Sequence, residues 1–253
     1  MLKRPTTNQI NQLGLRYSTD SNFIGTADFN RRFGGEHGLG VRVAGVVERG
    51  EDYHPGNDPH RYVGSIALDW SPVEAVHLQA DAVLGRDAPR DGGGFQVFTA
   101  GAQAPIAPLN PRRQYAQPWE YQTHLTRIYG GKADWSVAPG WTLSLSGQRF
   151  DQPFTYFNAV YFLQPGRNYT GFVFNQKAQE KYTVGEAKLR GEFRTGPLAH
   201  VVTIAATTQY EQFFQSYRGF IPINPGSLDN PDLAIPEPAN VLAPGKRYLD
   251  STE

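Results

Sequence analysis

The sequence predicts an all-β protein, an antiparallel transmembrane β-barrel segment of about nine or ten long strands. Polar and apolar side chains alternate over stretches of about eleven residues, which indicates strands with one polar and one apolar face. Strands average about 5–6 residues in globular proteins, whereas a strand that crosses a bilayer at a tilt needs about 9–11. Short turns alternate with long connections, so one end of the sheet carries turns and the other carries loops.

The hairpin over residues 61–87 shows the pattern most clearly. Its first strand places Ile66, Leu68 and Trp70 on one face, and a tight turn follows at 71–75. The same alternation gives nine strands, over residues 9–17, 22–33, 39–52, 61–70, 76–87, 119–137, 141–152, 181–194 and 198–215. Residues 88–118 and 153–180 are expected to be long loops.

Two further regularities favour a barrel in a membrane. All 19 prolines lie outside the predicted strands, as unbroken hydrogen-bond ladders require. Aromatic residues on the apolar face gather beside the short turns, where rings at one level form an interfacial girdle. They are Phe33, Trp70, Trp135, Trp141 and Phe193. A soluble β-sandwich or propeller also alternates, but it does not explain the girdle or the asymmetry of the connections.

Composition excludes several classes of protein. Twenty-four basic and 24 acidic residues balance, so no net field favours nucleic acid as a partner. There is no cysteine, which excludes disulfides, thiolate metal ligands and thiol nucleophiles. No apolar run approaches the roughly 18 residues of a membrane-spanning helix, and the start of the chain lacks the apolar core of a signal peptide. The chain is therefore expected to begin within a longer protein.

The first residues carry a resemblance to a known family. The stretch LKRPTTNQINQLGLRYSTDSNFIGTADFNRRFGG, with Lys3-Arg4-Pro5 at its start, resembles the passage of TonB-dependent siderophore receptors where the plug domain ends and the barrel begins. LDWSPVEAVHLQADAVLG at 68–85 is similar to a turn with the pattern Trp-x-Pro that recurs in this family. The motifs are short, and it is their order and spacing that make the resemblance specific.

The resemblance implies part of a 22-stranded barrel in the bacterial outer membrane. In the family, a plug fills the barrel, and ferric siderophores are imported with energy from the TonB complex, which contacts the plug. The expected division is 1–7 for the end of the plug and its junction, 8–215 for the first barrel strands, and 216–253 for an extracellular loop and a possible next strand. The chain shows no plug and no closing strand, so we expect that it neither inserts nor transports by itself.

The expected partners are a ferric siderophore, outer-membrane lipid and the TonB complex through the plug, and not nucleic acid. No catalytic motif is present, and no enzyme activity or cofactor is expected apart from the ferric siderophore as the transported ligand. A receptor for haem, cobalamin or a carbohydrate is an alternative, because the fold alone does not determine which ligand is transported. A structural or adhesive barrel whose long loops bind a partner is another.

Candidate ligand-binding residues come from the two long loops. A ferric siderophore is a large and often anionic chelate, so flat amphipathic rings and a few cations suit its recognition. The candidates are Arg112, Arg113, Tyr115, Trp119, Tyr156, Phe157 and Tyr161. The alternative is that these rings pack the loops together or join a girdle. His54 and His60 flank a loop but are only two ligands, so no metal site is predicted.

Overall fold

The structure is a computed structural model of the 253-residue chain. It describes residues 3–18, 21–35, 37–51, 56, 58–89, 96–98, 110, 113, 115–164, 167–231, 235–237 and 248–252; at 96–98, 217–220 and 248–252 it describes the backbone alone. Within these residues, no helix has the length and apolar character needed to cross a membrane.

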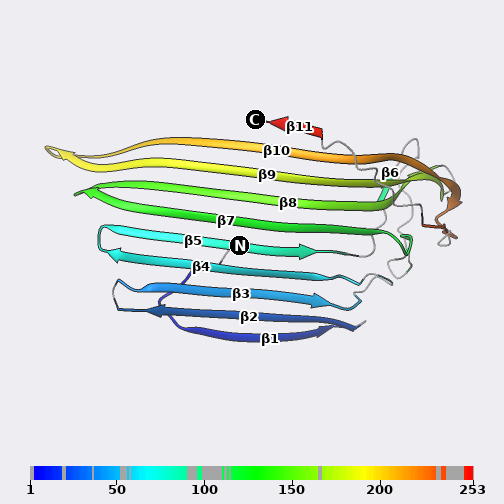
Figure 1. Cartoon of the computed structure of the whole chain (residues 1–253), viewed down its shortest axis with the longest axis horizontal. Helices are drawn as coiled ribbons and strands as arrows, with labels where there is room; N and C mark the ends of the chain where they lie inside the picture. Colours follow the sequence, from blue (N-terminus) through cyan, green and yellow to red (C-terminus); the bar gives the residue numbers. More distant parts are fainter. Residues whose placement is uncertain are drawn as a thin grey trace.

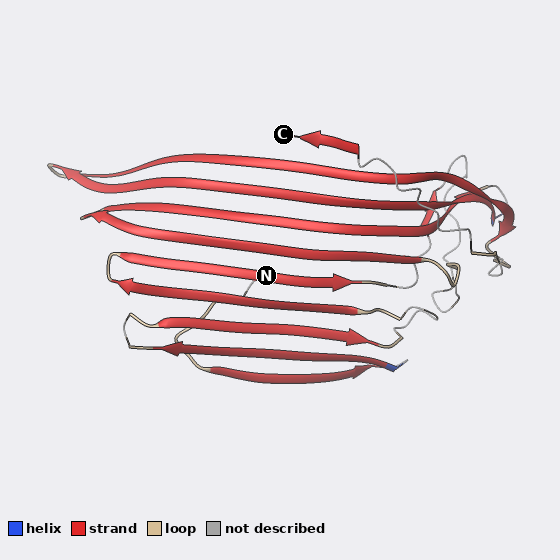
Figure 2. Ribbon diagram, in the orientation of Figure 1, coloured by secondary structure: helices blue, strands red, loops and turns tan. Residues whose placement is uncertain are grey.

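The described strands form one sheet in which each long strand pairs with the next along the chain (Figures 1 and 2). Their order is β1-β2-β3-β4-β5-β7-β8-β9-β10-β11, with antiparallel pairing throughout, and β6 is a short parallel addition to β8. The bounds are β1 Ile10–Ser18, β2 Asn22–Phe33, β3 Leu39–Arg49, β4 Arg61–Val73, β5 Val76–Asp87, β6 Gln96–Phe98, β7 Tyr121–Ala138, β8 Trp141–Leu163, β9 Asn168–Thr195, β10 Leu198–Ser227 and β11 Tyr248–Thr252. Short turns join the strands at one end, and Gly140 and Gly196 take the left-handed backbone conformation there that glycine tolerates best.

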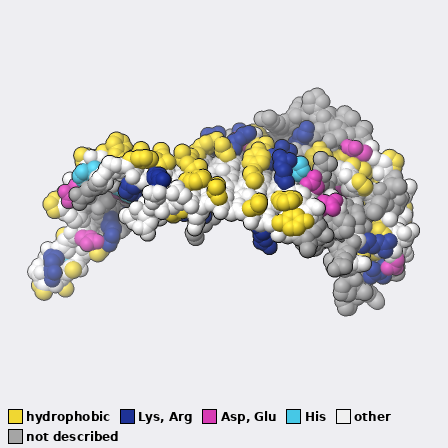
Figure 3. Space-filling model, turned by 90° about the horizontal axis from the view of Figure 1, so that it is seen from below, with side chains coloured by type: hydrophobic (Ala, Val, Ile, Leu, Met, Phe, Trp, Pro, Cys, Tyr) yellow, Lys and Arg dark blue, Asp and Glu magenta, His cyan; other side chains and the backbone are white. Residues whose placement is uncertain are grey.

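The registers give the sheet an apolar face and a polar face, as the alternation predicted. On the apolar face Val43 pairs with Ile66 and Trp70 with Leu78, and Leu15 is 81% exposed. Figure 3, which looks at the β1 edge, shows hydrophobic side chains gathered in a band along the sheet. Exposed large side chains of this face are Leu13, Leu15, Tyr17, Phe23, Phe29, Phe33, Leu39, Val43, Val47, Tyr62, Ile66, Trp70, Leu84, Tyr129, Trp135, Leu145, Phe193, Leu198, Ile204 and Tyr210. Such a surface needs an apolar covering.

The apolar face ends at a charged row towards the loop end. Arg127 forms an ion pair with Asp151 across β7 and β8 at 3.3 Å, and Lys181 lies over the ring of Phe214. From Arg127 to Trp135 the strand runs about 27 Å at roughly 3.4 Å per residue, which is comparable with the about 25 Å apolar band of membrane barrels.

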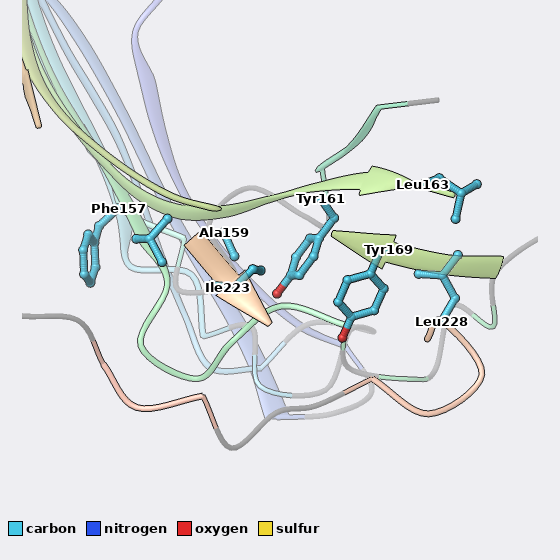
Figure 4. Packing of buried hydrophobic residues seen from close by; sticks show 8 residues of the cluster. Phe157, Ala159, Tyr161, Leu163, Tyr169, Ile223 and Leu228 are labelled. Carbon is cyan, nitrogen blue, oxygen red and sulfur yellow. The ribbon is translucent and has the colours of Figure 1, made fainter. Parts of the chain in front are cut away.

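Three strands continue well beyond this row. Strands β8, β9 and β10 contain 23, 28 and 30 residues and end in a part of the sheet where loops pack against it (Figure 1). The main buried hydrophobic cluster lies there, with Phe157 and Tyr161 from β8, Tyr169 from β9 and Ile223 from β10 (Figure 4). Trp119, Tyr121 and Ile235 pack against it, so the loops share a core with the ends of the strands.

Several predicted boundaries are wrong in this region. The expected loop at 153–180 consists mostly of strand, because β8 runs to Leu163 and β9 begins at Asn168. Strand β10 likewise continues past the predicted end at 215 to Ser227. Part of the predicted loop at 88–118, including Arg112, falls outside the described residues, and β6 lies within the same stretch.

The expectation that every proline lies outside the strands is also wrong. Pro72, Pro153, Pro222 and Pro225 lie within β4, β8 and β10. The pairing is irregular at each of them: register shifts fall between Trp70 and Val73, and on both sides of Pro222 in β10. Pro153 lies in a gap of the β7–β8 ladder. A residue without an N–H is tolerated where the ladder is already interrupted.

Candidate functional site

The polar face carries a network of ion pairs between neighbouring strands. Asp69 on β4 forms ion pairs with Arg32 of β2 and His77 of β5, each at 2.7 Å. Asp134 on β7 forms an ion pair with Lys132 at 2.8 Å. Asp69 therefore joins side chains of β2 and β5 to β4, whereas the Asp134–Lys132 pair lies within β7. Because the side chains are only partly buried, the pairs contribute little stability individually and mainly fix the positions of the charges.

The segment that precedes β1 lies across this polar face and is held by it. Asp28, which is 5% exposed, accepts hydrogen bonds from Lys3 at 2.7 Å and from Arg42 at 2.8 and 2.9 Å. Arg42 also donates to the carbonyl oxygen of Arg4, whose own guanidinium reaches Asp81 on β5 at 3.0 Å. Residues 3 and 4 are thereby held over β2–β5, although the chain next enters the sheet at its β1 edge (Figure 1).

Asn30 fixes the same segment through its main chain. Its side-chain oxygen accepts the N–H of Thr6 at 3.1 Å, and its side-chain nitrogen donates to the carbonyl oxygens of Thr6 and Asn8. The side chain is 1% exposed, so these bonds are shielded from water. A buried amide of this kind both satisfies and orients the backbone that it contacts.

The Asn30→Ala variant is expected to release residues 6–8 from the polar face. It removes the side chain that bonds the N–H and carbonyl oxygen of Thr6 and the carbonyl oxygen of Asn8, at a net cost of about 0.5–1.5 kcal/mol for each hydrogen bond. Hydrogen exchange in the whole receptor would then show faster exchange at Thr6, by about tenfold or more. Asn11→Ala, at an exposed position of β1, is the matched control and should leave exchange unchanged. Unchanged protection of Thr6 in Asn30→Ala would contradict this account.

A second feature of the polar face is a group of rings at the loop end, here called the aromatic wall. It consists of His124, Phe150, Phe154, Tyr156, Tyr182 and Phe213. The ring of His124 stacks on Phe154 at 5.6 Å, and Tyr156 meets both rings edge-on at 5.3 and 5.2 Å. Phe213 of β10 lies 6.3 Å from Phe154, so the group spans the four strands β7 to β10. The rings are partly exposed, and so a bound molecule can reach them.

His124, Phe154, Tyr156 and Phe213 of the aromatic wall lie beyond the charged row that ends the apolar face, and Phe150 and Tyr182 lie beside that row. Burial lowers the pKa of His124, although Asp87 and Glu180 act in the opposite direction. Burial also raises the pKa of the Tyr156 hydroxyl, and Glu180 adds to that effect. At neutral pH both groups are therefore uncharged, with Tyr156 able to donate a hydrogen bond and His124 able to accept one.

The structure separates the candidate residues that the sequence brought together. Only Tyr156 belongs to the aromatic wall, whereas its neighbour Phe157 points to the opposite face and is 1% exposed. Tyr115 and Tyr161 are also buried, and Tyr161 packs against Tyr169 at 4.8 Å (Figure 4). The placement of these three buried residues favours the packing role that was the alternative to binding.

The two remaining described candidates also make contacts within the loops. Trp119 lies 5.0 Å from Phe157 and donates to the carbonyl oxygen of Ile235, and Arg113 donates to that of Asp229 at 2.7 Å. Trp119 also lines an open cleft of about 620 Å³ together with His60, Arg86, Glu120, Tyr121 and Glu237. The cleft has charges of both signs and lies where the loops meet β5 and β7.

The described residues contain no cluster of three or more His, Asp or Glu side chains placed to hold a metal ion. His60 contacts Asp58 at 3.0 Å and Arg49 at 3.4 Å, and His54 lies outside the described residues. The chemistry that the aromatic wall offers is ring stacking and hydrogen bonding.

Sequence reasoning missed most of the aromatic wall. His124 and Phe150 were assigned to strands, and Phe154 to a loop, but none was proposed as a binding residue. One signal was present: Phe154 and Tyr156 are two residues apart, as are Phe150 and Gln152, which is the spacing of side chains on one face of a strand. Continuing the strand past Pro153 would have placed all four on the polar face.

Comparison with known structures identifies the fold of the sheet. No protein-family model matches the chain, and its sequence matches no curated protein. Among solved structures, the chain has the fold of a barrel segment from TonB-dependent siderophore receptors. The fold class that the sequence predicted is thus confirmed.

Three of these structures illustrate the likeness. The ferric preacinetobactin receptor BauA of Acinetobacter baumannii aligns with a TM-score of 0.83 and 19% identity, over 94% of this chain and 36% of its own. The ferripyoverdine receptor of the outer membrane of Pseudomonas aeruginosa gives 0.76 and 13%, over 99% and 33%. The ferric-catecholate import receptor Fiu of E. coli gives 0.76 and 14%, over 98% and 37%. The chain thus spans about a third of the length of the structures that it matches.

Proposed function

We propose that this chain is part of an outer-membrane receptor that binds a ferric siderophore at the cell surface and imports it with energy from the TonB complex. The observation that carries the proposal is the aromatic wall, a ligand-accessible group of rings at the loop end of a sheet with the receptor fold. Flat rings and hydrogen-bonding groups suit a large chelate whose organic ligand surrounds the iron.

The two faces of the sheet have separate roles in this proposal. The apolar face contacts outer-membrane lipid, and its aromatic residues beside the short turns lie at the lipid boundary. The polar face borders the transport path, and the segment held by Asp28 and Asn30 connects the sheet to whatever occupies that path. The protein acts as a transporter and not as an enzyme.

Deletion of the whole gene that encodes this chain tests the proposal. Under iron limitation, the deletion strain is expected to lose growth on at least one ferric siderophore and to lose uptake of radioactive iron supplied in that form. Complementation with the intact gene should restore both, and dissipating the proton gradient should abolish uptake in the complemented strain. Growth and uptake that are unaffected for every ferric chelate supplied would exclude an iron receptor and favour a different cargo or a structural barrel.

A further inference from the structure

The aromatic wall carries acidic side chains between its rings. Glu180 of β9 pairs in register with Gln152 on one side and with Phe213 on the other, and Glu211 of β10 pairs with Tyr182. The side chains of all five residues point to the polar face. Among the described residues, neither glutamate forms an ion pair within 4.0 Å. Their negative charges therefore act on whatever occupies the space in front of the wall.

Among the described side chains, the cations on the polar face of β4 and β7 are engaged elsewhere. Arg61 at the end of β4 binds Glu48 and Asp87, each at 3.2 Å, and Lys132 on β7 binds Asp134 at 2.8 Å. Lys181 follows Glu180 in the sequence but lies on the opposite face, over a ring of β10. His124 is neutral at neutral pH because burial lowers its pKa. Over its described side chains, the wall therefore has a negative potential.

Both components of the wall discriminate by charge in the same direction. The faces of aromatic rings attract cations, and carboxylates attract cations and repel anions. We propose that the aromatic wall selects a ferric chelate that presents a neutral or cationic surface and disfavours a polyanionic one. The inference rests on the proposed function and names the chemical class of its ligand, in place of the anionic chelate that the sequence suggested.

The test compares two ferric chelates on the whole receptor, expressed from its intact gene in outer-membrane vesicles. One is a ferric trihydroxamate with a free ammonium group, and the other is a ferric tricatecholate with an overall negative charge. The wild type is expected to bind the ammonium chelate at least about tenfold more tightly. The double variant Glu180→Gln with Glu211→Gln should weaken that binding about fivefold to tenfold and strengthen binding of the tricatecholate.

Two variants serve as matched controls. Glu186→Gln changes the same kind of residue on the same face of β9, about 20 Å nearer to the short turns, where Lys188 already pairs with Glu186 at 3.5 Å. It should leave both affinities unchanged. Phe154→Ala removes a ring without changing charge, so it should weaken binding of the ammonium chelate but, unlike the double glutamine variant, should not strengthen binding of the tricatecholate. Equal binding of the two chelates by the wild type, or a preference that the double glutamine variant does not alter, overturns the inference while the proposed function stands. Failure to bind any ferric chelate overturns the proposed function itself.

Discussion

The Phe157→Ala variant is expected to destabilise the loop end of the receptor by about 3–5 kcal/mol. Phe157 is 1% exposed and lies 5.0 Å from the ring of Trp119 and 5.7 Å from that of Tyr121. Its truncation removes the contact through which the loop before β7 packs on the long strands. Hydrogen exchange across residues 157–175 of the whole receptor should report the loss as local opening. The part of the sheet between the short turns and the charged row should be unaffected.

The neighbouring Tyr156→Ala variant is the control for this prediction. Tyr156 is partly exposed and points to the opposite face, so it loses only its ring contacts with His124 and Phe154, on the order of 1 kcal/mol. Ligand binding should show the reverse order, with Tyr156→Ala weakening binding more at conditions where both variants are folded. A loss of protection that is as large in Tyr156→Ala as in Phe157→Ala would mean that the two faces are not separated as described.

The part of the sheet between the short turns and the charged row could be predicted because its two faces meet different surroundings. Between the short turns and the charged row, an apolar side chain faces outward and a polar one faces the network of ion pairs. The period of two is then visible directly in the sequence, as over residues 61–87. The prediction of nine strands accordingly found every strand of this part, with ends that differ by a few residues.

The part of the sheet beyond the charged row could not be predicted in the same way because aromatic side chains lie on both of its faces. Along β8, Phe154, Tyr156 and Phe162 lie on one face, while Phe157 and Tyr161 lie on the other beneath the loops. The contrast between faces, and with it the period of two, disappears from the sequence. Prolines and aromatics then suggest a loop, although the chain continues as a strand.

The candidate site shows the same limitation at the level of single residues. The sequence indicated correctly that rings gather at the loop end, but it could not assign neighbouring rings to a binding face or to a core. That assignment depends on the register of β8 against β7, which pairs Gln122 with Tyr156 and Tyr121 with Phe157. A shift of one residue would exchange the two roles.

The Ile66→Arg variant is expected to destabilise the membrane-embedded receptor by about 2–4 kcal/mol. Ile66 lies on the apolar face of β4, midway between Tyr62 and Trp70, and is 42% exposed. In the proposed orientation this position is near the middle of the bilayer, where an arginine must leave water without a partner or distort the lipid around it. Urea unfolding of the receptor from lipid vesicles measures the difference in free energy.

The free-energy cost of an arginine should depend on its depth in the bilayer. This dependence distinguishes contact with lipid from an ordinary loss of packing. Tyr62→Arg changes the same face of the same strand nearer to its loop end and should cost about 0–1 kcal/mol, because the arginine there reaches the lipid headgroups. A buried face packed against protein would instead penalise both substitutions according to the contacts that each side chain loses. Equal costs at the two positions, or a cost below about 1 kcal/mol at Ile66, would therefore argue against lipid on the apolar face.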